Sequence, residues 1–182
     1  MKIRFIAMFA LPLALGACAS VAPVYTTSAR TQATLAALPA AQVGVAAFTQ
    51  PEDIVTMCRG NGPVEPPGHE SFAVFVHNAF VDELQHAGKF ASANPKVTLH
   101  GALTKVEFSS SHDLIKGYWD LGLQLRSDNG KQLKVAEHYD FDSGILAVTA
   151  CDNSAEALPK AVRALIQKTV ESPGFAGLLA AH

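Results

Sequence analysis

The clearest pattern of hydrophobic and polar positions in the chain predicts a helix over residues 71–87. Apolar side chains repeat there at helical spacing, and Gly88 follows where a helix commonly stops. The repeating residues are Phe72, Phe75, Val76, Ala79, Phe80 and Leu84. Because this apolar stripe covers one side of a helix, it must pack against a large apolar surface, and a sheet is the natural partner.

A second amphipathic helix is predicted near the C-terminal end. Asn153 and Glu156 have the spacing of a capping box. Apolar or small residues then recur on one face, at Leu158, Val162, Leu165, Ile166 and Thr169. Pro159 is unfavourable inside a helix, so the helix either begins near Leu158, with the proline in its first turn, or is kinked there. A last apolar turn follows at Phe175, Leu178 and Leu179.

Two earlier segments have the patterns of strands. Residues 43–48 form a short apolar run with β-branched side chains, typical of a buried strand. Residues 97–109 alternate, but the phase slips near Thr104 and Lys105, which indicates a bulge or bend. The polar run 109–113 predicts a connection to the next strand.

The next two segments predict a hairpin. Residues 118–126 alternate between apolar and polar side chains, and residues 132–142 alternate again. The turn between them contains Asn129 and Gly130, a strong hairpin signal. Glu137 interrupts the apolar face of the return strand, and the sequence offers no reason for it.

The order strand, helix, strand, strand, strand, helix predicts an α+β fold. We expect a single mixed sheet of about four strands with two helices packed on one face. A helix between the first two strands favours a right-handed parallel crossover. Two antiparallel reversals then make the fourth strand parallel to the first, so both end at the same edge of the sheet.

The N-terminus has the pattern of a secretory signal. Lys2 and Arg4 precede an apolar run over residues 5–15, and small residues lead to Cys18. This ending matches the lipobox of bacterial lipoproteins, and the match implies cleavage before Cys18 and lipidation of its thiol. The alternatives are an ordinary cleaved signal or a transmembrane helix, although the run is shorter than the about 20 residues that a span needs. Ala19 follows in place of aspartate, which in such lipoproteins implies the inner leaflet of the outer membrane.

These features divide the 182 residues into three parts. Residues 1–17 are the predicted signal peptide. Residues 18–42, rich in Ala, Thr, Ser and Pro, are predicted to be the lipidated cysteine and a flexible tether. Residues 43–182 are predicted to form a single periplasmic α+β domain.

Net charge and cysteine count narrow the range of possible functions. Without Lys2 and Arg4, the basic residues fall from 14 to 12 against 16 acidic ones, a formal charge of −4. A mildly acidic domain argues against nucleic-acid binding. Lipidation of Cys18 leaves Cys58 and Cys151 as an even pair in an oxidising compartment, which predicts a disulfide; two buried free thiols are the alternative.

The irregular stretch 49–69, rich in Gly and Pro, is the candidate partner surface. Loops held on a rigid scaffold commonly carry binding, although a merely variable surface loop has the same composition. Its candidate contact residues are Arg59, Asn61, Glu65 and His69. The lipid at Cys18 would bind the membrane, and this loop would bind an envelope protein.

Candidate catalytic chemistry is sparse. Residues 109–113 contain the residue types of a hydrolase triad, but a polar loop selects the same types, and a triad is recognised by spatial geometry. His138, Asp140 and Asp142 alternate along a strand and could hold a divalent metal; a solvated strand face gives the same pattern. We therefore expect no enzyme activity and no cofactor.

The chain resembles small outer-membrane lipoproteins of the YajG type. The similarity rests on the lipobox at Cys18, the long loop before the first helix, the helix end at Gly88 and the Asn129-Gly130-Lys131 hairpin. It also looks similar to the wider group related to the TolB N-terminal domain, which includes lipoprotein activators of peptidoglycan synthases. The short tether departs from those activators, which generally need a long arm.

These resemblances imply an adaptor or binding role with no catalytic residues. The first hypothesis is therefore a non-enzymatic, lipid-anchored binding or adaptor module in cell-envelope assembly or maintenance. The alternatives are an auxiliary lipoprotein of an envelope lipid or ABC transport system, and a metal-dependent envelope hydrolase.

Overall fold

A mixed four-stranded sheet forms the centre of the molecule. The computed structural model describes residues 19–39 and 42–180. The sheet has the order β2-β5-β6-β7, formed by β2 (Val43–Val45), β5 (Val97–Asp113), β6 (Lys116–Ser127) and β7 (Gln132–Asp142). β2 is parallel to β5, and the other neighbours are antiparallel. The predicted α+β class and parallel crossover are therefore confirmed.

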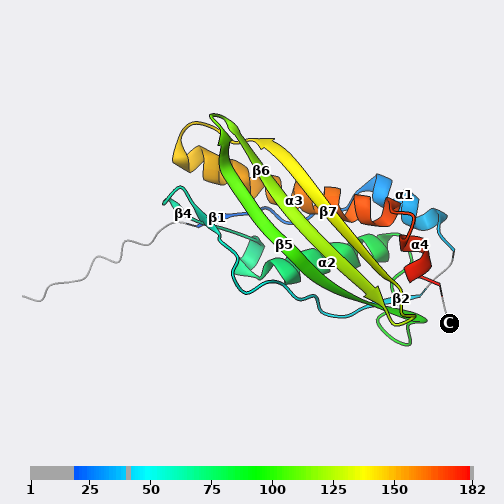
Figure 1. Cartoon of the computed structure of the whole chain (residues 1–182). Coiled ribbons are helices and arrows are strands. Elements are labelled where there is room, and N and C mark those ends of the chain that lie inside the picture. Colours follow the sequence, from blue (N-terminus) through cyan, green and yellow to red (C-terminus); the bar gives the residue numbers. More distant parts are fainter. Residues whose placement is uncertain (1–18, 40–41, 181–182) are drawn as a thin grey trace, which may run out of the picture.

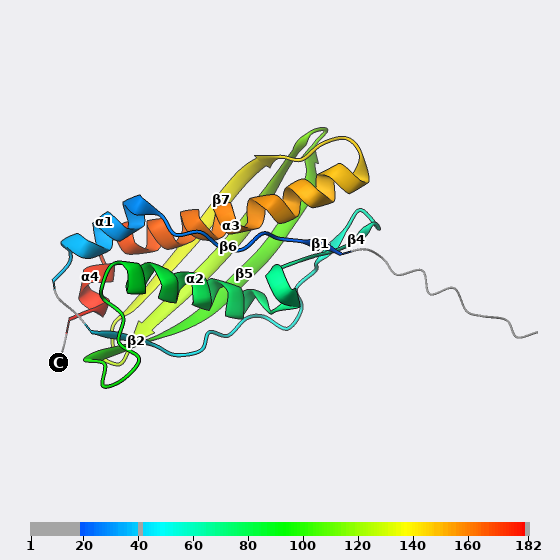
Figure 2. The same ribbon diagram turned by 180° about the vertical axis from the view of Figure 1, so that it is seen from behind.

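Two long helices cover one face of this sheet. Figure 1 shows α2 (Phe72–His86) and α3 (Ala147–Glu171) side by side behind the strands, with the short α4 (Phe175–Leu178) at one end, and Figure 2 shows the same helices in front of the strands. The largest fully buried side chains between the layers include Trp119, Phe80, Phe175, Leu84, Leu121, Leu158 and Ile166. None of the helices in the described residues combines the length and apolarity needed to cross a bilayer.

β5 and β6 form a longer hairpin than the alternation predicts. The expected bulge is present, because the register shifts between Leu103 and Lys105. The polar run 109–113, however, continues β5: Ser109 pairs with Tyr118, and a second irregularity follows before the turn. The prediction that residues 109–113 form a connection was wrong, because backbone hydrogen bonds between two strands can continue through solvent-exposed residues with polar side chains.

α3 begins earlier than the capping-box pattern predicts. Its first residue is Ala147, and the side chain of Asn153 donates to the carbonyl of Ser143 at 2.6 Å instead of capping a helix. Pro159 is buried inside the helix. Long-range packing explains the added turns, because Ala150 and Cys151 within them are fully buried in the core.

The stretch 49–69 is also more regular than its composition predicts. It contains β3 (Met57–Cys58), β4 (Gly62–Glu65) and the 3₁₀ turn η1 (Pro67–His69). β3 and β4 pair as a hairpin, and β1 (Ser20–Val21) adds to β4 in parallel, which makes a second sheet of order β1-β4-β3.

Residues 19–39 are packed on the domain, which corrects the expected flexible tether. After β1, the chain runs across the helices to α1 (Ala29–Ala37), as Figure 2 shows. Tyr25 donates a hydrogen bond to Glu83 of α2, and Arg163 of α3 donates to the carbonyl of Thr26 at 3.0 Å. The predicted signal peptide and the lipidation at Cys18 lie outside the described residues.

Candidate functional site

A disulfide fixes the β3–β4 hairpin to helix α3. Cys58 at the end of β3 is bonded to Cys151 in the second turn of α3, with their Cα atoms 5.7 Å apart. Both cysteines are fully buried. The predicted disulfide is therefore confirmed, and it closes a loop of 93 residues, which in the chain-entropy model stabilises the fold by about 4–5 kcal/mol.

Arg59, predicted as a partner contact, is used within the fold. Its backbone adopts a left-handed conformation with φ 47°, which turns the hairpin directly after the disulfide. Its guanidinium donates to Ser110 Oγ at 3.1 Å, to the carbonyl of Ser110, and to the carbonyl of Ile145 at 3.0 Å. Arg59 thus ties three segments together at one end of the sheet.

The other three predicted loop residues do not gather into one site. The backbone N–H of Asn61 donates to the carbonyl of Cys58 at 2.8 Å and closes the hairpin turn. The imidazole of His69 contacts the carboxylate of Glu65 across the η1 turn. These contacts shape the loop itself, and none of the three residues lines the groove that lies beside residues 51–57.

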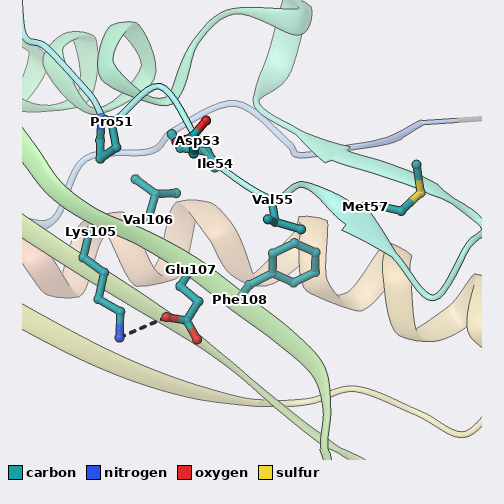
Figure 3. Close-up of a pocket in the computed structure, with 9 residues that line it drawn as sticks. All are labelled: Pro51, Asp53, Ile54, Val55, Met57, Lys105, Val106, Glu107 and Phe108. Carbon is teal, nitrogen blue, oxygen red and sulfur yellow. Dashed lines mark ion pairs between the residues drawn. The ribbon is translucent and has the colours of Figure 1, made fainter.

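A groove of about 380 Å³ lies between residues 51–57 and β5 (Figure 3). The extended chain bridges β5 as far as the pair Thr49 and Ala102, and then diverges from it. The groove is lined by Pro51, Asp53, Ile54, Val55, Met57, Lys105, Val106, Glu107 and Phe108. β2 pairs only with the first residues of β5, so in the described part of the sheet β5 is an edge strand along the groove.

The groove has an apolar side and a charged side. Val55 and Met57 are 75% and 55% exposed, whereas Phe108 is half-buried and stacks on Trp119 with ring centroids 4.8 Å apart. On the charged side, Lys105 Nζ lies 3.2 Å from Glu107 Oε2. Such a surface suits a ligand that has both apolar side chains and polar backbone.

Lys105 also belongs to a charge cluster on the open face of the sheet. Its ammonium lies 2.6 Å from Asp120 Oδ2, and the other oxygen of Asp120 accepts from His138 Nδ1. Partial desolvation acts to raise the pKa of Asp120, but the hydrogen bonds from Lys105 and His138 outweigh it and lower that pKa. The hydrogen bond to Asp120, in turn, raises the pKa of His138.

Of the three candidate metal ligands, His138 and Asp140 lie together and Asp142 is paired elsewhere. His138 Nε2 lies 3.2 Å from Asp140, while its other nitrogen binds Asp120. Asp142 instead pairs with Lys116 at 2.5 Å. Within residues 19–39 and 42–180, no group of three His, Cys, Asp or Glu side chains is arranged to hold a metal ion.

The hydrolase residue types in 109–113 also make other contacts. Ser109 Oγ accepts from the backbone N–H of Ser111 at 3.2 Å. The ring of His112 meets the ring of Tyr118 edge-on, with centroids 5.4 Å apart. Residues with triad chemistry therefore lie along one strand end, where their contacts are local.

Two acidic residues that sequence reasoning did not explain have structural partners. Glu83 of α2 is completely buried and accepts from Tyr25 and from the backbone N–H of Ser28, each at 2.7 Å. Glu137, the interruption in the apolar face of β7, pairs with Lys168 of α3 at 3.0 Å. For Glu137, the break in the alternation of β7 was a sequence signal of its pairing; the sequence pattern around Glu83 gave no such signal.

Comparisons with known proteins identify the fold only. No family model and no curated protein matches the chain. The crystal structure of XCC0632 from Xanthomonas campestris, of family DUF330, is similar with a TM-score of 0.59 and 11% identity, covering 88% of this chain and 96% of that one. This likeness supports the same α+β fold and no particular activity.

Two further structures are less similar. A protein of Caulobacter crescentus CB15, provisionally described as a lipoprotein, has a TM-score of 0.43 at 13% identity, over 84% of this chain and 97% of that one. The L103M variant of PelC from Paraburkholderia phytofirmans, described as a dodecamer, has a TM-score of 0.38 at 15% identity, over 88% and 95%. Neither likeness is close enough to carry an argument.

Proposed function

We propose that this chain is a non-enzymatic lipoprotein that binds an envelope protein and serves in assembly or maintenance of the cell envelope. The lipobox at Cys18 supports an acyl anchor, and Ala19 after it supports the inner leaflet of the outer membrane. The domain would then work in the periplasm. The resemblance to YajG-type lipoproteins belongs to the same proposal.

The observation that carries the binding role is the groove beside β5. An edge strand offers backbone hydrogen-bonding groups to an incoming extended segment, and neighbouring pockets can receive its side chains. Here Val55 and Met57 supply exposed apolar surface on one side, and the Lys105–Glu107 pair supplies charge on the other. The disulfide at Cys58 holds the wall of the groove in place, so a partner need not order it.

The contacts of the reactive residue types support a role without catalysis. Asp120 binds both His138 and Lys105, and His112 packs on Tyr118. Each of these residues lies on the strands of the central sheet, outside the groove's apolar wall.

The proposal is tested first by crosslinking in cells followed by mass spectrometry. The native chain is compared with a Cys18→Ala variant that cannot receive lipid. A discrete envelope partner that is lost or weakened without the anchor would support an adaptor at the membrane. Crosslinks only to abundant neighbours, with no specific partner, would contradict it.

A second experiment tests whether the partner binds in the groove. Val55→Glu puts a charge on the exposed apolar wall without disturbing the core, because this side chain is 75% exposed. Val24→Glu is the matched control, since Val24 is 71% exposed and lies on the N-terminal segment outside the groove. The partner's crosslinks should fall for Val55→Glu alone; an equal yield for both variants would exclude the groove.

The apolar wall also favours one alternative, an auxiliary lipoprotein of an envelope lipid or ABC transport system. A volume of about 380 Å³ lined by Ile54, Val55 and Phe108 is within the range of small-ligand sites. Native mass spectrometry of the purified protein decides between the two. A co-purifying lipid that Val55→Glu releases would favour the transport role over the adaptor.

A further inference from the structure

Five large apolar side chains lie exposed at one end of the molecule, which we call the apolar tip. They are half of the ten such side chains in the described residues: Leu114, Ile115, Ile145, Leu146 and Val148. Two belong to the turn between β5 and β6, and three to the junction of β7 and α3. The two parts are joined, because the backbone N–H of Ser143 donates to the carbonyl of Ile115 at 2.7 Å.

The described chain begins at this same end. Figures 1 and 2 both show β1 beside β4 at the end where the β5–β6 turn and the start of α3 lie. Ser20 pairs with Val64 of β4, and its hydroxyl donates to Asp152 of α3 at 2.9 Å. Asp152 follows Val148 by four residues, so the two lie on one face of α3 about 6 Å apart along the axis.

Because of this placement, the chain between an acyl anchor on Cys18 and the folded domain is very short. Cys18 precedes Ser20 by two peptide bonds, so their Cα atoms are at most about 8 Å apart. Ser20 is held by backbone pairing and by Asp152, and the Cys58–Cys151 disulfide secures the same end. Acyl chains on Cys18 must therefore bring this end of the domain to the bilayer.

We infer that the apolar tip inserts into the lipid leaflet that holds the acyl chains of Cys18. This inference rests on the lipidation in the proposed function. The membrane would cover side chains that are 51% to 89% exposed in the free domain, and it would orient the domain with the sheet's hairpin end towards the lipid.

The charges around the tip do not favour an anionic surface as the contact, since the exposed Asp113 adjoins Leu114 and the two nearby basic side chains are engaged within the domain. Lys116 beside the turn is paired with Asp142 at 2.5 Å, and Arg59 is engaged by Ser110 and by the carbonyl of Ile145. Binding through the tip should therefore change little with salt, unlike binding through exposed basic side chains.

The test uses the full lipidated protein reconstituted in phosphatidylcholine vesicles, with or without brominated acyl chains as quenchers. Leu114→Trp and Leu146→Trp place a fluorophore in the tip. Lys131→Trp is the control, because Lys131 is exposed at the β6–β7 hairpin at the opposite end of the sheet. The native Trp119 is fully buried and contributes a constant background. The mass of the N-terminal peptide reports lipidation independently.

Emission from both tip variants should shift to the blue and be quenched several times more strongly than emission from Lys131→Trp. Equal quenching at both ends of a lipidated, vesicle-bound protein would overturn the inference and leave the proposed lipoprotein role intact. An unmodified Cys18 in the mass spectrum would overturn both. A blue shift without vesicles that grows with protein concentration would show that a second copy covers the tip, and would also overturn the inference.

Discussion

Tyr25 and Glu83, 58 positions apart in the chain, share a hydrogen bond of 2.7 Å between the phenol and Oε1. Glu83 is fully buried in α2, and the backbone N–H of Ser28 donates to the same oxygen. Burial of the phenol, reinforced by its hydrogen bond to Glu83, raises the pKa of Tyr25. The N-terminal segment thus supplies two donors to one oxygen of a carboxylate that is costly to bury inside the helix layer, while the other oxygen, Oε2, has no hydrogen-bond partner among the described residues.

Tyr25→Phe should therefore destabilise the protein by about 1–3 kcal/mol, because Glu83 stays buried with one donor fewer. Urea unfolding followed by circular dichroism measures this. Tyr118→Phe is the control, since the Tyr118 hydroxyl contacts Glu107 in an exposed setting and should change stability by less than about 0.5 kcal/mol. Equal effects of the two variants would mean that residues 19–39 add little to the stability of the domain.

Loss of the disulfide should lower the free energy of unfolding by about 4–5 kcal/mol, because the oxidised unfolded chain carries a closed loop of 93 residues. The comparison is between oxidised protein with and without reductant. The double variant Cys58→Ala with Cys151→Ala is the control, and its stability should not respond to reductant. If the oxidised protein were no more stable than the reduced one, the predicted stabilisation by the disulfide would be wrong.

The pair of His138 and Asp120 predicts a specific pH dependence. The Asp120 carboxylate favours the imidazolium, so the pKa of His138 is raised above its ordinary 6.5. The stabilisation is complete below pH 6.5 and is lost as the pH rises through the folded-state pKa. The lowered pKa of Asp120 acts in the opposite sense, since its contribution is lost as the pH falls through that value.

NMR titration of the His138 ring checks this directly. Its midpoint should lie above 6.5 in the native protein and move down in Asp120→Asn. An unchanged midpoint in Asp120→Asn would refute the coupling.

Gly101 should not tolerate a side chain. A Cβ at this position would come within 2.4 Å of the ring of Phe48, which packs over β5 and is 8% exposed. Gly101→Ala should therefore cost about 1–3 kcal/mol through overpacking. Gly174→Ala is the matched control, since a Cβ there meets Leu133 at an ordinary 3.4 Å and φ is negative. Thermal unfolding of the two variants tests the difference; equal melting temperatures would contradict it.

The sequence by itself determined the elements whose side chains report on local geometry. The helical stripe of α2, the alternation in β5 to β7, the Asn129-Gly130 turn and the slip after Leu103 all follow from periods of 3.6 or 2 residues. The disulfide could be predicted as well, because cysteine count and compartment limit the pairing. Lipidation at Cys18 stays a prediction from the lipobox.

Only the tertiary structure decided how polar and irregular segments are used. Residues 19–39 were predicted to be a tether because they are rich in Ala, Thr, Ser and Pro, yet they pack through Tyr25, Thr31 and Leu35 onto elements far away in the chain. The groove depends on where residues 51–57 leave β5. Long-range pairings of this kind leave no periodic trace, since their partners lie dozens of positions away.

The candidate site follows the same division. Sequence reasoning selected the stretch 49–69 and Cys58, and the groove does lie beside that stretch. It selected Arg59 as a partner contact, but the tertiary structure uses that guanidinium to bind Ser110 and Ile145. A charged residue in a loop can face either solvent or a neighbouring segment, and only the packing of the chain decides between them.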